Sequence, residues 1–547
     1  MVAAKQEVAA CGAYYKLAVS LLCLTAMFGA LPLYTNVYLT YTPGYQCLLN
    51  ATNLRNKSWN TEINSANTSG EMKTVEADQK QCYFHNNSSN ISSDTLGGNM
   101  IACESWRFLK SPEVESISTE FSLVCGNAWL SPLITSAQML GFMVGSLAGG
   151  TLSDRLGRRP VFLTSILLEA TSLLVVSLSS TLATVYVSMF VMGVGMIVRG
   201  VTGMVIINEI VPNRHRRAVG ILAMVSESLS GTLVPLVALL LSDWRWISLA
   251  SSVSLFVVSF PVFIFVYETL KWLHQTNNPG EIEKVLTKIG RINGEKPCVE
   301  NQDTPEETNQ LTTKDTSNQT KSYNYLDLVK VDFIRRRIII LSYAWFAADM
   351  AFYGLTFNAN HLGGNRYINS FLTAVVEFPS HIICYLVVRK YGCRCSFIFS
   401  AIVTVICMVA VPLMQQVDVW ASVACAMLGK LFTTVGYTVL FIFTGDLFPT
   451  MMRTQAYGAC SFMARFGSIL VPYILFLGST VHQSLPYVIM ATVSLFAVVA
   501  MFFLPETKGL HLPETLEEAR SQDRHRFQCT ERRDNRNCVN NNTVANS

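Results

Sequence analysis

The chain has 547 residues, of which 50% are hydrophobic and 14% are charged, and its formal net charge is +4 at pH 7. Because soluble chains carry about 25% charged residues, this deficit predicts that most of the sequence avoids water. The small net charge gives no support for a nucleic-acid partner.

Twelve apolar runs are long enough, or nearly so, to cross a hydrocarbon core that needs about 20 helical residues. Only helices and closed barrels satisfy every backbone group inside lipid, and runs of this length favour helices. The runs lie near 16–39, 129–152, 161–180, 184–208, 218–241, 246–267, 338–359, 367–389, 395–414, 419–443, 455–478 and 485–504. We therefore expect an all-α membrane protein with 12 transmembrane helices, the first of which is a spanning helix and not a cleaved signal peptide.

The polar segment 41–128 is expected to be a large, glycosylated extracellular loop. Its clustered Asn-X-Ser/Thr sequons are typical of a lumenal or extracellular surface. The sequon asparagines are Asn50, Asn56, Asn67, Asn86, Asn87 and Asn90. Four cysteines indicate two disulfides, and the sequence leaves three pairings open. These cysteines are Cys47, Cys82, Cys103 and Cys125.

Basic residues predict the orientation of the spans. Short loops on one side are rich in arginine and lysine, whereas those on the other side carry little beyond Arg245 and Arg366. The basic loop residues are Arg155, Arg158, Arg159, Arg214, Arg216, Arg217, Arg389, Lys390, Arg394 and Arg453. The positive-inside rule therefore predicts a multi-pass plasma-membrane protein with both termini in the cytosol.

A repeat divides the spans into two halves. "RLGRR" (155–159) matches "KYGCR" (390–394), "EIVPNRHR" (209–216) matches "DLFPTMMR" (446–453), and "ET" (268–269) matches "ET" (506–507), all at nearly one offset. Two six-helix bundles of this kind are typical of carriers whose substrate site lies between the halves. The expected parts are 1–40 (tail and first span), 41–128 (loop), 129–267 (remaining N-terminal spans), 268–337 (cytosolic linker with short amphipathic helices), 338–504 (C-terminal spans) and 505–547 (cytosolic tail).

The stretch "GGTLSDRLGRRP" (149–160) resembles the loop signature of the major facilitator superfamily. The resemblance implies that this loop holds the two halves together on the cytosolic side when the carrier faces outward. Asp154, Arg155, Gly157 and Arg158 would have this gating role. We expect Glu209, Asp446 and Arg453, in the repeated loops, to share it.

Four further stretches resemble the organic cation, organic anion and carnitine transporter family, solute carrier family 22. They are "STEFSLVC" (118–125), "VEFPS" (376–380), "GKLFTTVGYTVLFIFTGDLFPTMMR" (429–453) and "LPETKGLHLPETLEE" (504–518). The resemblance covers almost the whole chain. It implies a secondary carrier of small organic ions that works by alternating access.

Ionisable residues inside spans are candidates for binding or coupling, because burying them in lipid is costly. The basic candidates are Arg199, His381, Lys430 and Arg465, and the acidic ones are Glu169, Glu227, Asp349 and Glu377. Structural alternatives stay open for several of them. Glu169 could pair with a neighbouring helix, Glu377 could shape its helix, and Lys430 or Arg199 could form internal ion pairs.

Arg465, in "MARFGSILVPY", is the strongest substrate-binding candidate. The resemblance implies Arg at this position in anion and carnitine carriers and Asp in cation carriers. A guanidinium matches a carboxylate bidentately, although Arg465 could instead pair only with Asp349. His381, Lys430 and Arg199 would add positive charge, whereas Asp349 and Glu227 would receive a cationic group.

Candidate residues of both charges therefore favour a zwitterionic substrate such as carnitine. Tyr353 and Tyr437 are the preferred candidates for cation–π contacts with its cationic group. The sequence contains no Walker A pattern, which would indicate ATP use, and no motif for a metal or an organic cofactor. Sodium or proton coupling and the oligomeric state stay open. The alternatives are an organic cation transporter, a transport-inactive receptor, a channel or, least favoured, a membrane enzyme.

Overall fold

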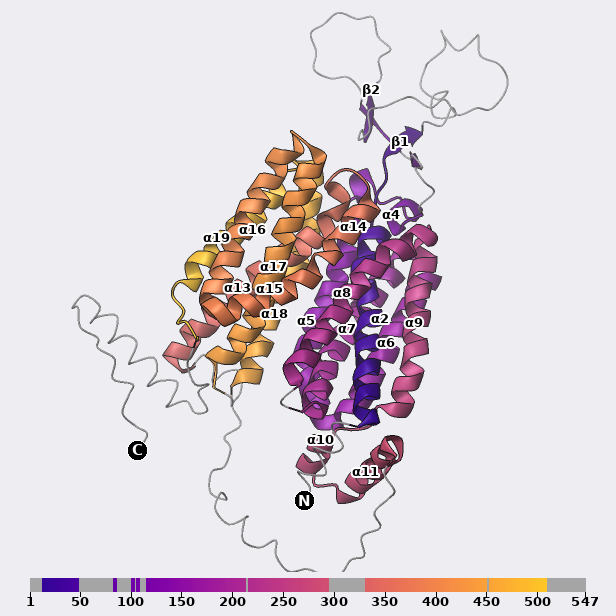
Figure 1. Cartoon of the computed structure of the whole chain (residues 1–547). Helices are drawn as coiled ribbons and strands as arrows, with labels where there is room; N and C mark the ends of the chain where they lie inside the picture. Colours follow the sequence, from indigo (N-terminus) through magenta and orange to yellow (C-terminus); the bar gives the residue numbers. More distant parts are fainter. Residues whose placement is uncertain are drawn as a thin grey trace, which may run out of the picture.

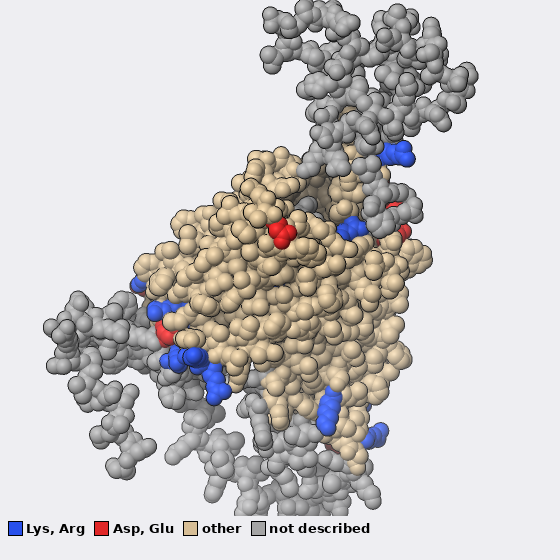
Figure 2. Space-filling model, turned by 45° about the horizontal axis from the view of Figure 1, so that its top comes forward, with Lys and Arg blue, Asp and Glu red and all other residues tan. Residues whose placement is uncertain are grey.

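The computed structural model describes residues 12–48, 82–85, 100–103, 105–108, 115–212, 215–294, 330–449 and 452–508. Figure 1 shows two helical bundles side by side, one indigo to magenta and the other orange to yellow. The sequon asparagines, and most of the linker and the tail, lie outside the described residues. In the space-filling view the bundles have a broad wall of uncharged side chains, as expected for a surface that contacts lipid (Figure 2).

The N-terminal half consists of six long helices. They are α2 (Ala13–Leu39), α5 (Leu130–Leu156), α6 (Arg158–Leu178), α7 (Leu182–Ile210), α8 (Arg216–Leu240) and α9 (Trp244–Phe265). After α9 come two short helices, α10 (Leu270–Gln275) and α11 (Pro279–Asn293), in the predicted linker. Apolar side chains of α10 and α11 pack against the start of α2, where Tyr14 and Ala18 are buried.

The C-terminal half repeats this plan with one helix divided. Its elements are α13 (Asp332–Phe357), η2 (Asn358–His361), α14 (Arg366–Val375), α15 (Glu377–Tyr391), α16 (Cys393–Gln415), α17 (Val419–Leu447), α18 (Arg453–Thr480) and α19 (Leu485–Met501). In the described chain, 11 spans are long and apolar enough to cross a membrane, and α19 is a shorter apolar helix of 17 residues. The predicted twelve-helix, all-α membrane fold is confirmed.

The eighth span is interrupted at Val376, between α14 and α15. Pro379 explains the interruption, because a proline ring clashes with the carbonyl four residues earlier. That carbonyl belongs to Val375, the last residue of α14. As a consequence Glu377 stands at the first position of α15, where its side chain is buried in the protein.

The described part of the segment 41–128 contains short strands that the sequence did not predict. β1 (Tyr45–Leu48) pairs antiparallel with β4 (Ser105–Phe108), and β2 (Tyr83–His85) pairs antiparallel with β3 (Met100–Ala102). Cys82 forms a disulfide with Cys125. Cys103 is also disulfide-bonded, and the Cys47 side chain lies outside the described residues.

A short stretch at the base of this segment joins it to the N-terminal half. It contains α4 (Ile117–Glu120) and η1 (Cys125–Asn127). The Glu120 carboxylate accepts a hydrogen bond from Trp244 Nε1 (2.8 Å) and forms an ion pair with Arg245 (2.5 Å), both at the start of α9. Part of the family-like stretch 118–125 therefore attaches the segment 41–128 to the bundle.

The repeat seen in the sequence has a common geometry in the two halves. Gly157 (φ 102°) precedes α6 and Gly392 (φ 87°) precedes α16, and positive φ values of this kind favour glycine. The Glu268 carboxylate accepts hydrogen bonds from the first two backbone N–H groups of α6, at 3.0 Å each. Glu506 does the same near the start of α16, at 3.3 and 3.0 Å. Each glutamate thus satisfies helix N–H groups that would otherwise lack partners.

Candidate substrate site between the two halves

The two halves touch toward the side that carries the loop 41–128. Tyr38 of α2 stacks on Tyr367 of α14, with ring centroids 5.6 Å apart. The Arg366 guanidinium lies 4.2 Å from the centre of the Tyr41 ring. We call these four residues the outer clasp, because two come from each half.

Deeper in the molecule, Glu377 bridges the halves. Its carboxylate accepts hydrogen bonds from Tyr34 of α2 (3.1 Å) and from Ser228 of α8 (3.0 Å). On its own half it forms an ion pair with Lys430 Nζ of α17 (3.1 Å). One buried carboxylate therefore joins two helices of the N-terminal half to the centre of the C-terminal half.

Lys430 is fully buried, and the C-terminal half surrounds its ammonium group. Nζ donates to the Thr356 hydroxyl (2.6 Å) and the Phe352 carbonyl (3.4 Å), and it lies over the Phe352 ring. A buried ammonium needs such partners, because an unpaired charge inside protein is strongly unfavourable. Of the alternatives left open for Lys430, the structure favours an internal ion pair.

Arg465 of α18 lies in an aromatic and hydroxyl-bearing environment at the centre of the molecule. Nη1 and Nη2 donate to the Tyr353 and Tyr437 hydroxyls at 3.4 and 3.3 Å. Asp349 of α13 lies 3.7 Å away, measured between Nη1 and Oδ1, and is fully buried. From the other half, Phe142 of α5 presents its ring 5.6 Å from the guanidinium carbon.

The ion pair between Arg465 and Asp349 is long, and several of its nitrogen and oxygen atoms form no hydrogen bond. Arg465 Nε and both Asp349 oxygens lack a hydrogen-bond partner in the described structure. Polar groups buried without a partner are rare in native proteins and call for an explanation. The pairing with Asp349 that the sequence left open is present, and the guanidinium also retains unused donor capacity.

Glu227 of α8 is exposed, although it lies in the middle of a span. It precedes Gly231 by one helical turn, and residues four apart share a helix face. A Cβ added to Gly231 would lie 2.9 Å from Ala374 of the other half, so this face points toward the C-terminal half. Glu227 also interacts electrostatically with Arg199, Glu377, Tyr34 and Tyr353. It therefore faces the centre of the molecule and not the lipid.

Of the remaining candidates, Arg199 and Glu169 are partners of each other, and His381 lies at the edge of the central region. Arg199 forms a buried ion pair with Glu169 (2.7 Å) and donates to the Thr25 carbonyl (3.3 Å), all within the N-terminal half. This geometry matches the internal ion pair that the sequence left open for both residues. His381 lies one turn after Glu377, and its buried Nδ1 has no hydrogen-bond partner among the described residues.

The predicted gating residues lie at the end opposite the outer clasp. Arg158 pairs with Asp154 (2.9 Å) and Glu209 (3.2 Å), inside the N-terminal half. In the C-terminal half, the positions of Arg158 and Glu209 correspond to Cys393 and Asp446, whose side chains lie 3.7 Å apart. Arg155 is exposed, and Arg453 has two guanidinium nitrogens without a hydrogen-bond partner in the described structure.

Several residues of the central region were missed by sequence reasoning. Tyr34, Phe142, Ser228 and Thr356 contact its charged groups, yet each lies in an apolar run and carries no charge that would single it out. Only their placement at the interface identifies them. In contrast, the charged members were found because a charge inside a span is rare.

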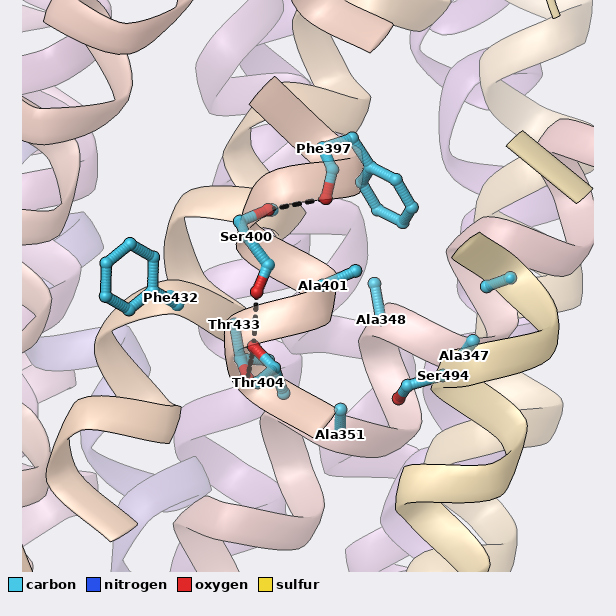
Figure 3. A pocket seen from close by; sticks show the side chains of 12 residues that line it. Ala347, Ala348, Ala351, Phe397, Ser400, Ala401, Thr404, Phe432, Thr433 and Ser494 are labelled. Carbon is cyan, nitrogen blue, oxygen red and sulfur yellow. Dashed lines mark hydrogen bonds between the residues drawn. The ribbon is translucent and has the colours of Figure 1, made fainter. Parts of the chain in front are cut away.

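A separate small hollow lies in the C-terminal half, among α13, α16, α17 and α19. Figure 3 shows its small side chains, together with the Ser400, Thr404 and Thr433 hydroxyls. These hydroxyls bond to helix carbonyls and to one another. Because no charged residue lines this hollow, we place the candidate site between the halves and not here. In the described part of the chain, no group of three His, Cys, Asp or Glu side chains is placed to hold a metal ion.

Comparison with known proteins agrees with this architecture. The Major Facilitator Superfamily family model matches residues 127–429 and 368–534. Solute carrier family 22 member 2 of Homo sapiens is 30% identical over 418 residues, which cover 75% of this chain and 73% of the relative. The organic cation transporter protein of Drosophila melanogaster is 29% identical over 526 residues, covering 93% and 92%. The inward-open xylose transporter XylE from E. coli has a TM-score of 0.56 at 15% identity, over 72% of this chain and 89% of XylE.

Proposed function

Because the chain belongs to solute carrier family 22 of the major facilitator superfamily, and is thus a membrane transporter of small organic ions, we propose that its substrate is a small organic zwitterion. Transport of this kind needs no cofactor. In this proposal the carboxylate of the zwitterion binds Arg465 and its cationic group binds near Glu227. The remainder of the substrate lies against the Tyr353 ring.

The observation that carries the proposal is that one tyrosine, Tyr353, interacts with two groups of opposite charge, Arg465 and Glu227. The Tyr353 hydroxyl accepts from Arg465 and also interacts electrostatically with Glu227. Arg199, Lys430 and Arg465 each have a carboxylate within 4 Å, whereas Glu227 forms no ion pair among the described residues. A zwitterion would supply the cation that Glu227 lacks, and its carboxylate would use the free donor capacity of Arg465.

The first prediction tests the Arg465 end. Replacing Arg465 alone would leave Asp349 buried without a partner, which costs about 3–5 kcal/mol of stability. We therefore use the double variant Arg465→Gln/Asp349→Asn, which removes both charges. In proteoliposomes it is expected to lose uptake of labelled carnitine at least tenfold, because the carboxylate loses its bidentate partner.

Matched substrates make this test specific. Wild type and the double variant are compared with carnitine, an aryl carboxylate and a quaternary ammonium without a carboxylate, each with and without sodium. Glu227→Gln is expected to reduce uptake of carnitine and of the ammonium but to spare the carboxylate. Unchanged carnitine uptake by a well-incorporated double variant would refute the proposal.

A second candidate substrate class is the organic cation. Asp349 already balances the charge of Arg465, whereas Glu227, near the middle of its span, is exposed and forms no ion pair among the described residues, so the charge offered to a substrate there is negative. The fly relative is named an organic cation transporter. Uptake of the quaternary ammonium that exceeds carnitine uptake and survives in the Arg465→Gln/Asp349→Asn variant would favour this class.

We also propose that the carrier resides in the plasma membrane with both termini in the cytosol and Asn50 to Asn90 outside. The arginine-rich loops support this orientation through the positive-inside rule. The six sequons give independent support. To test which side the loop occupies, the glycan on the wild-type chain is compared with that on a variant in which all six asparagines are replaced by glutamine. We expect the wild type to carry glycan and the variant to lose it.

A further inference from the structure

We propose that a basic corner of the C-terminal half binds the headgroup of an anionic phospholipid. The C-terminal corner consists of Arg336, Arg389, Lys390, Arg394 and Lys508, with Glu506 among them. These residues come from the start of α13, the end of α15, the start of α16 and the chain that follows α19. Figure 2 shows Lys and Arg side chains gathered along the lower left edge of the molecule, on the side of this half.

Direct contacts hold the corner together. Lys508 Nζ donates to the Lys390 carbonyl (2.7 Å), and Arg394 Nη1 donates to the Leu504 carbonyl (2.9 Å). The Arg336 guanidinium lies 5.9 Å from the centre of the Phe503 ring. Segments far apart in the sequence thus present their cationic groups on one surface.

The carboxylates of the corner do not neutralise it. Glu506 uses both of its oxygens to bind backbone N–H groups near the start of α16. Five cationic side chains therefore face two carboxylates, that of Glu506, which already serves a helix terminus, and that of Asp446, which lies 3.7 Å from Cys393. Four of the five are exposed, and Arg394 is half-buried with its Nε lacking a partner.

The equivalent corner of the N-terminal half shows that the fold does not require this charge. When the two halves of the chain are aligned on Gly157 and Gly392, six charged positions of the N-terminal half can be compared with the C-terminal half. In the N-terminal half, three of them are cations and three are anions. These are Arg155, Arg158, Arg159, Asp154, Glu209 and Glu268. The corresponding C-terminal positions hold Arg389, Lys390, Cys393, Arg394, Asp446 and Glu506, so an arginine replaces Asp154.

Arg336 and Lys508 then raise the excess in the C-terminal half to three positive charges, against two in the N-terminal half if Lys271 and Lys16, at the start of α2, are also counted. Both corners have the same glycine turn and the same glutamate that binds the following helix. Since the six aligned positions of the N-terminal half carry no net charge and build the same turn, the turn itself does not require the excess charge of the C-terminal half.

An anionic headgroup fits the position as well as the charge. Tyr391, Phe502 and Phe503 are 53%, 59% and 61% exposed beside the basic residues. Exposed aromatic residues next to arginine and lysine are typical of the boundary between hydrocarbon and headgroups. Clusters of four or more basic residues directly beside a span bind anionic lipids of the cytosolic leaflet. The assignment to that leaflet rests on the proposed orientation, whereas lipid binding itself does not.

The experiment uses the full chain in nanodiscs of phosphatidylcholine with and without phosphatidylserine. Wild type is compared with Arg389→Gln/Lys390→Gln and with the control Lys284→Gln/Lys288→Gln, which removes two exposed lysines from α11. Native mass spectrometry counts the retained phosphatidylserine, and thermal unfolding measures the stabilisation that it gives. We expect the corner variant to bind phosphatidylserine roughly thirtyfold more weakly, and the control to match wild type.

Equal retention of phosphatidylserine by all three proteins would overturn the proposal. The acidic tail of the chain is another candidate occupant of the corner, because it contains Glu514, Glu517 and Glu518. A chain that ends at Lys508 lacks this tail and therefore tests whether the tail competes with the lipid. If only this shortened chain binds phosphatidylserine at the corner, the tail and not a lipid occupies it in the full chain, and the proposal is wrong. Because no transport is measured, these outcomes are independent of the substrate.

Discussion

At the scale of single residues, Glu377 and Lys430 dominate the interface between the halves. Their 3.1 Å ion pair is buried, and Tyr34 and Ser228 complete the hydrogen bonding of the carboxylate. Removing one member of a buried pair leaves the other charged and desolvated, at a cost of about 3–5 kcal/mol. Removing both avoids that penalty.

We therefore predict strong non-additivity between these two residues. Lys430→Met and Glu377→Gln should each lower the thermal unfolding midpoint, and the double variant should recover most of the loss, because neither buried charge then lacks a partner. Residues in contact show coupling energies of about 0.5–3 kcal/mol in such cycles. Additive midpoint shifts, measured by thermal unfolding in detergent, would contradict the pairing. The pair Lys284→Met and Glu281→Gln is the control, because this ion pair is exposed.

At the scale of elements, the interrupted helix α14–α15 positions Glu377. Pro379 interrupts the helix hydrogen bonding at Val376, which keeps a helical conformation (φ −64°, ψ −20°), and Glu377 directly after it contacts α8 and α17. Pro379→Ala should allow the helix to run through Val376, because the clash with the Val375 carbonyl disappears. The carboxylate would then rotate away from Tyr34 and Ser228.

The expected result is slower transport at equal or greater stability, since alanine favours helix by about 3 kcal/mol over proline. Uptake in proteoliposomes and the unfolding midpoint are measured on the same preparation. Pro412→Ala is the matched control, because Pro412 lies inside the continuous helix α16. A Pro379→Ala carrier that transports normally would show that the interruption has no role in transport.

The same elements show how far the sequence predicts this molecule. The spans were predictable because twenty apolar residues in a row have few alternatives to a membrane helix. The repeat was visible because Gly157, Gly392, Glu268 and Glu506 keep their spacing. The strands β1–β4 were missed because three or four residues carry no readable alternation. Most partners of the buried charges were not predictable, since Glu377 and Lys430 are 53 residues apart and only packing brings them together, whereas the pairing of Arg465 with Asp349 was an alternative that the sequence left open.

At the scale of the whole molecule, the halves are in contact on the side that bears the loop 41–128. The outer clasp joins Tyr38 and Tyr41 of one half to Arg366 and Tyr367 of the other. An aromatic pair contributes about 0.5–1.5 kcal/mol. An exposed cation–π contact contributes about 0.5–1 kcal/mol. The clasp thus contributes on the order of 1–2.5 kcal/mol to closure of this side.

Weakening the clasp should shift the carrier toward the state open on this side. For Arg366→Gln/Tyr367→Ala we expect roughly a tenfold rise in the population of that state, since about 1.4 kcal/mol corresponds to a factor of ten. A cysteine at Phe142, beside Arg465, would report the change through its labelling rate with a membrane-impermeant thiol reagent applied from outside. Arg245→Gln is the control, because Arg245 contacts Glu120 and Ser177 of its own half. If both variants label at the wild-type rate, the clasp does not hold the halves together, and closure depends instead on the deeper contacts of Glu377.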